Sequence, residues 1–230
     1  MMRLLVSVRD VPEAFVAAQG GADFIDLKEP REGALGGLPI ATIAGIVRAL
    51  RAQHGHLAIS ATIGDLPMND LPAILARVDA VAACGVDYVK VGIEREAQSR
   101  AVLDALAATG HRVVPVFIAD RGLDFDHVAH ACASKFPGLM VDTADKLAGS
   151  LFEVMSVAEL RRFVTLVRAS GALAGLAGAL RQPQLAALHA LAPDFAGFRS
   201  AVCAGNRSGE LDPARLRALA AALHAAPITA

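Results

Sequence analysis

Four lysines stand out in a chain that carries most of its positive charge on arginine. Of the 22 basic residues 18 are Arg, and the lysines are Lys28, Lys90, Lys135 and Lys146. An arginine guanidinium stays protonated, whereas a desolvated lysine amine can lose its proton and act as a base or attack a carbonyl. A genomic bias toward Ala and Arg would give the same count without any function, so the position of each lysine must decide between the two explanations.

Two aspartates accompany three of these lysines. Asp26 lies two residues before Lys28, and Asp142 lies four residues before Lys146. In such a cluster, repulsion between amines and partial desolvation can lower a lysine pKa, and a second lysine or a carboxylate can then move protons. These are the groups of a Schiff-base aldolase. The alternative is a set of structural ion pairs, Asp26–Lys28 and Asp142–Lys146.

The elements that must position these groups follow from the apolar pattern. Short runs rich in Val, Ile and Phe alternate with longer Ala-, Leu- and Arg-rich segments of helical period, which predicts a parallel sheet. The predicted strands cover 4–8, 23–28, 57–63, 88–93, 112–119, 139–143, 173–178 and 195–201. The predicted helices cover 12–19, 40–53, 71–84, 95–109, 125–134, 157–170, 184–191 and 213–224. Eight such units predict one (β/α)8 barrel domain, a TIM barrel, over residues 1–230.

Two details of this pattern bear on the boundaries of the elements. Asp10, Asp70 and Asp212 precede predicted helices that have a proline near their start, which is where N-cap residues belong. The segment 173–178 is rich in Ala and Gly and is also compatible with a continued helix.

Three of the lysines fall where this kind of barrel keeps its chemistry, at the carboxyl ends of the strands. Lys28 ends the second predicted strand, Lys90 lies in the fourth, and Lys146 closely follows the sixth. Side chains alternate along a strand, so Asp26 shares the inward face with Lys28 while their apolar neighbours face the helices. We therefore expect these lysines to converge with Asp26 and Asp142 in one pocket. The fourth lysine ends a predicted helix, where the helix carbonyls favour a cation.

Loops after the seventh and eighth strands commonly bind phosphate in this fold, through backbone N–H groups. Here they supply Gly178, Arg199, Ser200 and Gly205 as candidate phosphate-binding residues, although ordinary turns would explain the glycines equally well. The glycines of the stretch 33–37, after the second strand, are candidates for a second phosphate. Asp65 and Asp120, which follow the third and fifth strands, are candidates either for assisting proton transfer or for capping helices.

Composition limits the partners and cofactors. The net charge is -1, Trp is absent and there is one Tyr, so no nucleic-acid partner is expected. Three cysteines without a CxxC pair predict neither a metal site nor a disulfide framework, and they suit a reducing cytoplasm. No apolar run is long enough to cross a membrane, so no membrane association is expected. We expect no cofactor, and the apolar helices favour assembly into a homo-oligomer.

Six motifs spread over most of the chain carry a resemblance to a known family. They are Asp-Val-Pro-Glu-Ala at 10–14, Gly-Gly-Ala-Asp-Phe-Ile-Asp-Leu-Lys-Glu-Pro at 20–30, Glu-Gly-Ala-Leu-Gly at 32–36, Asp-Tyr-Val-Lys-Val-Gly at 87–92, Met-Val-Asp-Thr-Ala at 140–144 and Arg-Ser-Ala-Val-Cys at 199–203. Together these motifs resemble the (5-formylfuran-3-yl)methyl phosphate synthase family.

The resemblance implies a (β/α)8 lyase of methanofuran biosynthesis, a part of one-carbon metabolism. Such an enzyme joins two molecules of glyceraldehyde 3-phosphate with loss of phosphate and water, so the expected partner is a small phosphorylated triose. By the same resemblance, Lys28 is the Schiff-base lysine and Lys90 the general base. Asp26, Asp142 and Lys146 are implied as their acid–base partners.

Two alternatives remain open at this point. One is another class I aldolase or a phosphosugar isomerase on the same barrel, which would release no inorganic phosphate. The other is a non-catalytic barrel that binds phosphorylated metabolites. Glu29, where archaeal members tend to carry Asn, and the loop 145–149 depart from the family pattern and leave the detail of these loops open.

Overall fold

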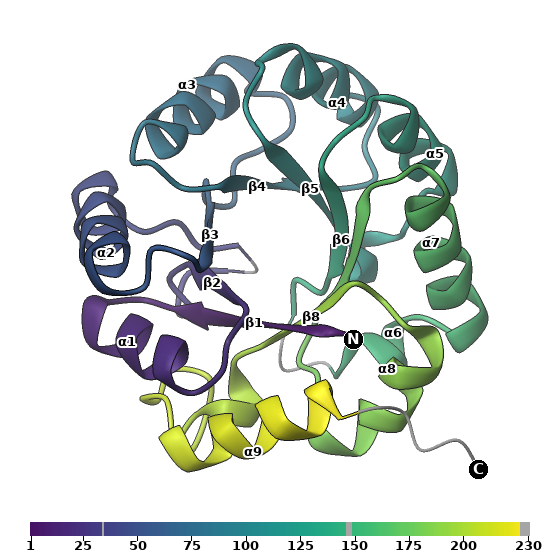
Figure 1. The fold of residues 1–230 in the computed structure, drawn as a ribbon. Coiled ribbons are helices and arrows are strands. Elements are labelled where there is room, and N and C mark those ends of the chain that lie inside the picture. The colour runs from purple at the N-terminus through teal and green to yellow at the C-terminus, as the bar shows by residue number, and fades with distance from the viewer. Residues whose placement is uncertain (34, 146–148, 226–230) are drawn as a thin grey trace.

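The computed structural model describes residues 1–33, 35–145 and 149–225. Eight parallel strands close into a barrel in chain order, and helices surround it (Figure 1). The strands are β1 (Arg3–Val8), β2 (Phe24–Leu27), β3 (Ala58–Thr62), β4 (Tyr88–Ile93), β5 (Val113–Ile118), β6 (Gly138–Asp142), β7 (Leu173–Leu176) and β8 (Phe195–Phe198). The helices are α1 (Val11–Gln19), α2 (Ile40–Gln53), α3 (Leu71–Ala82), α4 (Ser99–Ala108), α5 (Phe125–Ala133), α6 (Leu151–Val154), α7 (Val157–Ala169), α8 (Leu185–Leu191) and α9 (Pro213–His224). The predicted (β/α)8 TIM-barrel fold is confirmed, and the single-domain assignment stays a prediction.

The predicted strands are all present, and the ambiguous segment 173–178 contains a strand, β7. The largest difference is in β8, which ends at Phe198 and not at residue 201. The chain turns there into a short 3-10 helix (Ser200–Val202), in which the Val202 N–H donates to the Arg199 carbonyl at 3.1 Å. The predicted eighth strand was therefore too long at its carboxyl end.

Two helical regions also differ from the prediction. The helix predicted from residue 95 begins only at Ser99, because the Ser99 hydroxyl donates to the Glu94 carbonyl at 2.6 Å and keeps the preceding segment in a turn. The short helix α6 was not predicted. It begins at a capping box formed by Ser150 and Glu153, and its four residues are too few to show a helical period.

The expected helix N-caps are confirmed. Asp10, Asp70 and Asp212 cap α1, α3 and α9, and each carboxylate accepts a hydrogen bond from a backbone N–H of the first turn at 2.8 to 3.1 Å. Each of these helices has a proline at its first or second position. Such caps are each worth about 1 kcal/mol of helix stability, so they help to set where the outer helices begin.

Two apolar layers follow from the alternation of side chains along the strands. The larger layer lies between the strands and the helices and contains Ile25, Leu27, Val89 and Val91, as the sequence predicted. A smaller cluster lies inside the barrel. Because the outer layer takes one face of each strand, the other face is left to build the interior of the barrel.

Aromatic rings line the amino-terminal end of the barrel interior, which we call the floor, around a hollow that Lys90 also borders. The ring of Phe24 lies 5.5 Å from that of Phe195 and 6.4 Å from that of Tyr88. A Cβ at Gly175 would lie 2.1 Å from the Phe195 ring, so only glycine leaves room for this ring. Polar side chains lie at the carboxyl-terminal end of the interior, which we call the mouth.

The described residues contain free thiols at Cys84, Cys132 and Cys203 and no disulfide. None of their helices has the length and apolar character needed to cross a membrane. In the same residues, no group of three or more His, Cys, Asp or Glu side chains is placed to hold a metal ion.

Candidate active site

The register of the strands brings polar side chains together above the floor. Asp26 of β2 lies beside Ser7 of β1 and Ser60 of β3. Between β3 and β4, Thr62 lies beside Lys90. These side chains point inward because their strand neighbours fill the outer apolar layer. The expectation that Asp26 and Lys90 face the barrel interior is confirmed.

Asp26 and Lys90 form a fully buried ion pair. The Lys90 Nζ donates to Asp26 Oδ2 at 3.0 Å. Lys90 is 2% exposed and Asp26 is 0% exposed. Ser60 donates to the other carboxylate oxygen at 2.6 Å, and Ser7 donates to Oδ2 at 3.2 Å. Burial alone would raise the pKa of Asp26, but the charges of Lys90 and Lys28 and the hydrogen bond from Ser60 outweigh it and lower this pKa below its usual value. Asp26 is therefore a carboxylate at neutral pH.

Lys28 lies one layer nearer to the mouth and faces Asp142 of β6. It follows β2 directly, and its backbone N–H still donates to the Val8 carbonyl at 3.0 Å, which continues the inward alternation of the strand. The Lys28 Nζ lies 3.8 Å from Asp142 Oδ2, and both side chains are buried. The Thr143 N–H holds the other oxygen of Asp142 at 2.8 Å.

The pairing differs from the local ion pairs considered from the sequence. Asp26 is paired with Lys90, and no Asp26–Lys28 ion pair occurs among the residues that the structure describes. Residues two positions apart on one strand are separated by about 6.6 Å along the strand, whereas neighbouring strands lie about 4.8 Å apart. The Asp26 carboxylate therefore meets an amine from another strand more readily than the amine of Lys28. The predicted role of Lys146 and its pairing with Asp142 lie outside the described residues.

These side chains share one cavity of about 430 Å3, including the part open to solvent. Seven of the predicted site residues line it, namely Asp26, Lys28, Lys90, Asp142, Gly178, Arg199 and Ser200. Gly205 does not line it, although it belongs to the loop that borders the mouth. The convergence of Lys28 and Lys90 with Asp26 and Asp142 therefore matches the expectation, and their chemical roles stay predictions.

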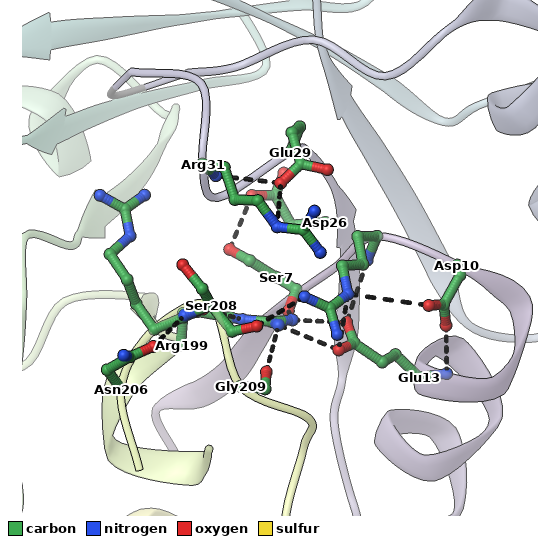
Figure 2. Close-up of polar contacts among 12 residues, drawn as sticks. Ser7, Asp10, Glu13, Asp26, Glu29, Arg31, Arg199, Asn206, Ser208 and Gly209 are labelled. Atoms are coloured by element: carbon green, nitrogen blue, oxygen red, sulfur yellow. Dashed lines mark hydrogen bonds and ion pairs between the residues drawn. The ribbon is translucent and has the colours of Figure 1, made fainter. Parts of the chain in front are cut away.

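Arg199 uses its whole guanidinium within the protein (Figure 2). Its two Nη atoms donate to the Glu13 carboxylate of α1 at 2.5 and 2.9 Å. The remaining donors reach the carbonyls of Ser7 at 3.0 Å, Arg207 at 2.9 Å and Gly209 at 2.8 Å. All five N–H donors are thus occupied, so a phosphate would reach the guanidinium only by displacing one of these partners.

The electrostatics of Arg199 agree with this structural role. Burial alone would lower the pKa of its guanidinium, but the hydrogen bonds and the charge of Glu13 outweigh burial and raise this pKa. A buried, bidentate pair of this kind fixes the relative position of the two elements that carry it. Arg199 therefore braces the loop after β8 against α1 and β1.

The carboxylates after the third and fifth strands hold loops in place. Asp120 accepts hydrogen bonds at 2.7 Å from the N–H groups of both Ala144 and Asp145, which fixes the start of the loop after β6. Asp65 accepts from the Leu35 N–H at 3.2 Å, which holds the loop after β2. Neither aspartate caps a regular helix in the described structure, and neither lines the lysine cavity.

Three residues of this site were not singled out from the sequence. Ser7 and Ser60 are polar inward positions in otherwise apolar strands, so the alternation that located Asp26 would also have found them. Arg207 lines the cavity with its side chain, but no local pattern distinguishes it from other loop arginines. Only the folded arrangement of the loop after β8 brings it to the mouth.

The fold and the site define a (β/α)8 barrel that carries buried lysine–carboxylate pairs at the carboxyl ends of its strands. The chain belongs to the 4-HFC-P synthase family, whose model matches residues 4–220. It is 35% identical over 222 residues to the (5-formylfuran-3-yl)methyl phosphate synthase of Methanosarcina mazei, covering 90% of this chain and 93% of the relative. Its identity to the enzyme of that name from Archaeoglobus fulgidus is 33% over 240 residues, covering 97% and 100%. The family resemblance found in the motifs is confirmed.

Solved structures support the fold. Phosphoribosyl anthranilate isomerase from Thermococcus kodakaraensis superposes with a TM-score of 0.67 at 15% identity, covering 97% of this chain and 99% of the isomerase. 3-Hexulose-6-phosphate synthase from Salmonella typhimurium gives a TM-score of 0.64 at 18% identity, covering 97% and 100%. At these identities the likeness establishes the barrel and nothing about the reaction.

Proposed function

We propose that this protein is a (5-formylfuran-3-yl)methyl phosphate synthase that condenses two molecules of glyceraldehyde 3-phosphate, through a lysine Schiff base, in methanofuran biosynthesis. Family membership supports the product, and one observation carries the mechanism. Two buried lysines lie in the same cavity, each opposite its own aspartate. Charged groups seldom occupy the interior of a protein without a functional reason, so this arrangement favours catalysis over a purely structural role.

Lys28 is the residue that forms the imine. It lies nearer to the mouth than Lys90, and its 3.8 Å separation from Asp142 is longer than the 3.0 Å hydrogen bond between Lys90 and Asp26. One glyceraldehyde 3-phosphate first isomerises to its ketone form, dihydroxyacetone phosphate, as hydrogen moves from C2 and its hydroxyl group to C1 and its oxygen. The Lys28 amine then attacks the carbonyl carbon of this ketone, so a C–N bond forms and the carbonyl oxygen leaves as water. Asp142 lies beside this amine and takes up the proton that the nitrogen releases.

Lys90 moves protons one layer below. Asp26 is a carboxylate and holds the Lys90 ammonium in place. Once this ammonium has protonated the departing carbonyl oxygen, the resulting amine takes a proton from the carbon next to the imine. The electron pair of that C–H bond moves into the imine and gives an enamine.

The enamine carbon then attacks the aldehyde of the second triose phosphate and forms the new C–C bond. Elimination of one phosphate, ring closure, loss of water and release of Lys28 by hydrolysis give the furan aldehyde phosphate. No oxidant or reductant is needed, because the sequence consists of condensation and elimination steps. Gly178 and Ser200, at the ends of β7 and β8, border the cavity on the side where the first phosphate is expected.

Product analysis tests the reaction. Incubation with glyceraldehyde 3-phosphate should give a furan absorbance and inorganic phosphate together, in equal amounts. Formation of phosphate without a furan, or of an aldol product without phosphate release, would contradict the proposal.

Borohydride trapping tests the role of Lys28. Reduction in the presence of triose phosphate should add the mass of one reduced triose phosphate to the peptide that contains Lys28. The exposed Lys135 provides the matched control, since Lys135→Arg should leave both the adduct and the product unchanged. An adduct on Lys90 in place of Lys28 would reverse the assigned roles.

A further inference from the structure

The loop 204–209, which follows β8, has a backbone fixed by two arginines (Figure 2). Arg199 donates to the carbonyls of Arg207 at 2.9 Å and Gly209 at 2.8 Å, and Arg9 donates to the carbonyl of Ser208 at 2.6 Å. The Ser208 N–H is itself held by the Asn206 side chain at 2.9 Å. The loop is therefore a firm platform for any side chain that it directs into the cavity.

Arg207 is the basic side chain that this loop places at the cavity. Within the described parts of the chain, its guanidinium makes one hydrogen bond, 3.5 Å to the Gly33 carbonyl, and no ion pair within 4.0 Å. Arg199, eight residues earlier, has all five donors occupied. The two arginines thus differ in what they can still bind, and only Arg207 has donors available for a ligand.

The surroundings of Arg207 leave its charge poorly compensated. Burial lowers the pKa of this guanidinium, and the like charge of Arg199 lowers it further, while Asp142 and Asp65 act in the opposite direction. The group stays protonated at neutral pH, because a guanidinium does not lose its proton in proteins. A half-buried cation with one long hydrogen bond is stabilised by any anion that reaches it.

Arg207 belongs to the loop after β8, but its guanidinium contacts the loop after β2. The strands follow the order β7, β8, β1 and β2 around this part of the barrel. Gly178 and Ser200 lie at the first two of these strands, whereas the Arg207 guanidinium reaches across the end of β1 to Gly33, in the loop after β2. Lys28 ends β2, so an anion on Arg207 would lie on the Lys28 side of the mouth.

The glycines after β2 have a structural reason of their own. A Cβ at Gly36 would lie 1.9 Å from the Glu32 carbonyl oxygen, and a Cβ at Gly33 would lie 1.8 Å from a carboxylate oxygen of Asp65. These positions are needed for the tight path of the loop. The cation next to this loop, and not its glycines, is the group suited to a second phosphate.

We propose that Arg207 binds the phosphate of the second triose, at an anion site distinct from the one at Gly178 and Ser200. The identity of the ligand rests on the proposed function, whereas the anion site itself does not. Two triose phosphates bring two dianions into a cavity that already holds the carboxylates Asp26 and Asp142. Each phosphate therefore needs a cation or a set of N–H donors of its own.

Titration with inorganic phosphate tests the site without any catalysis. Amide chemical shifts of the 15N-labelled full chain should show two binding curves, one for residues 178–180 and 200 and a second for residues 205–209. Arg207→Gln should weaken the second curve about tenfold or more and leave the first unchanged, as expected for the loss of a charge-assisted hydrogen bond. Arg207→Lys, which keeps the charge, should restore part of the affinity.

The exposed Arg121, which follows β5 on the same end of the barrel, provides the matched control. Arg121→Gln removes the same charge and should change neither curve. Equal weakening of both curves by Arg207→Gln would place Arg207 in the first phosphate site, and no weakening would remove it from anion binding. Either result overturns the proposal.

Kinetics separate this proposal from the proposed function. In Arg207→Gln, the concentration of dihydroxyacetone phosphate that half-saturates borohydride trapping should stay the same, while the concentration of glyceraldehyde 3-phosphate for half-maximal furan formation should rise about tenfold or more. A wild-type protein that forms no furan but shows the two phosphate curves would refute the proposed function alone. Normal furan kinetics in Arg207→Gln would refute only the role of Arg207.

Discussion

The floor and the mouth of the barrel are built by the same strands, one or two inward positions apart, yet they have opposite chemistry. Phe24 and Asp26 share the inward face of β2, and Tyr88 and Lys90 share that of β4. The floor holds packed rings, whereas the mouth holds paired charges. The comparison shows how the same strands carry apolar packing at one end of the interior and paired charges at the other, because each strand contributes separate inward positions to the two ends.

The largest expected effect is a loss of activity on replacing Lys28, which lies in the mouth. Lys28→Arg keeps a cation opposite Asp142 but cannot form an imine, so furan formation should fall by at least about a thousandfold. The thermal unfolding midpoint should change little, since the charge pair is retained. Activity within tenfold of wild type would show that the mouth does not act through this amine.

The pair below Lys28 should affect both activity and stability. Asp26→Asn leaves the Lys90 charge buried without its counter-ion, which should cost about 3–5 kcal/mol of unfolding free energy in addition to activity. Urea unfolding at pH 7 measures this loss.

A double replacement distinguishes charge from packing at the same place. Asp26→Leu combined with Lys90→Met removes both charges and should recover most of the stability but none of the activity. Failure of the double variant to regain stability over Asp26→Asn would show that the loss came from packing and not from the unpaired charge.

Substitutions in the floor should lower the stability of the fold more than the activity. Phe195→Ala removes a ring that packs on Phe24 and against Gly175, and should lower the free energy of unfolding by about 3–5 kcal/mol. Activity per folded molecule should fall only a few-fold at a temperature well below the unfolding midpoint. Phe195→Leu, which refills part of the space, is the matched control and should lose about half as much or less. A loss of activity as large as that of Lys28→Arg would mean that the two regions are not separate.

The smallest expected effect is on how the stability of the fold depends on pH. The pKa of Asp26 is lower in the folded than in the unfolded protein, so its ionisation stabilises the fold above the unfolded value of about 3.9. This stabilisation is lost as the pH falls below that value and through the lower pKa of the folded state. Acid unfolding curves of Phe195→Leu should keep the wild-type slope in this range, whereas those of Asp26→Leu with Lys90→Met should be flatter. An unchanged slope in the double variant would show that other groups dominate.

The sequence predicted the faces of the strands well, because alternation is a local property. It therefore placed Asp26, Lys28, Lys90 and Asp142 in one pocket. Which amine meets which carboxylate depends on the register between strands, and spacing along one strand does not contain that information.

The loops were predicted less completely for the same reason. The place of Arg199 after the last strand predicts a phosphate ligand. Its actual partner, Glu13, lies at the other end of the chain, where no local pattern connects the two residues. From the sequence alone Arg207 is an ordinary loop residue, and only the folded structure shows its contact with the loop after β2. Contacts of this kind depend on closure of the barrel, which no local pattern describes.

The Glu13–Arg199 pair also bears on how the protein is made. The two residues are 186 positions apart in sequence, so the brace cannot form until nearly all of the barrel has left the ribosome. Contacts between such distant segments close slowly, because the cost in loop entropy is paid before the contact forms. The loop after β8 therefore takes its place at the mouth only at the last stage of synthesis, after the strands that carry Lys28 and Lys90 have been made.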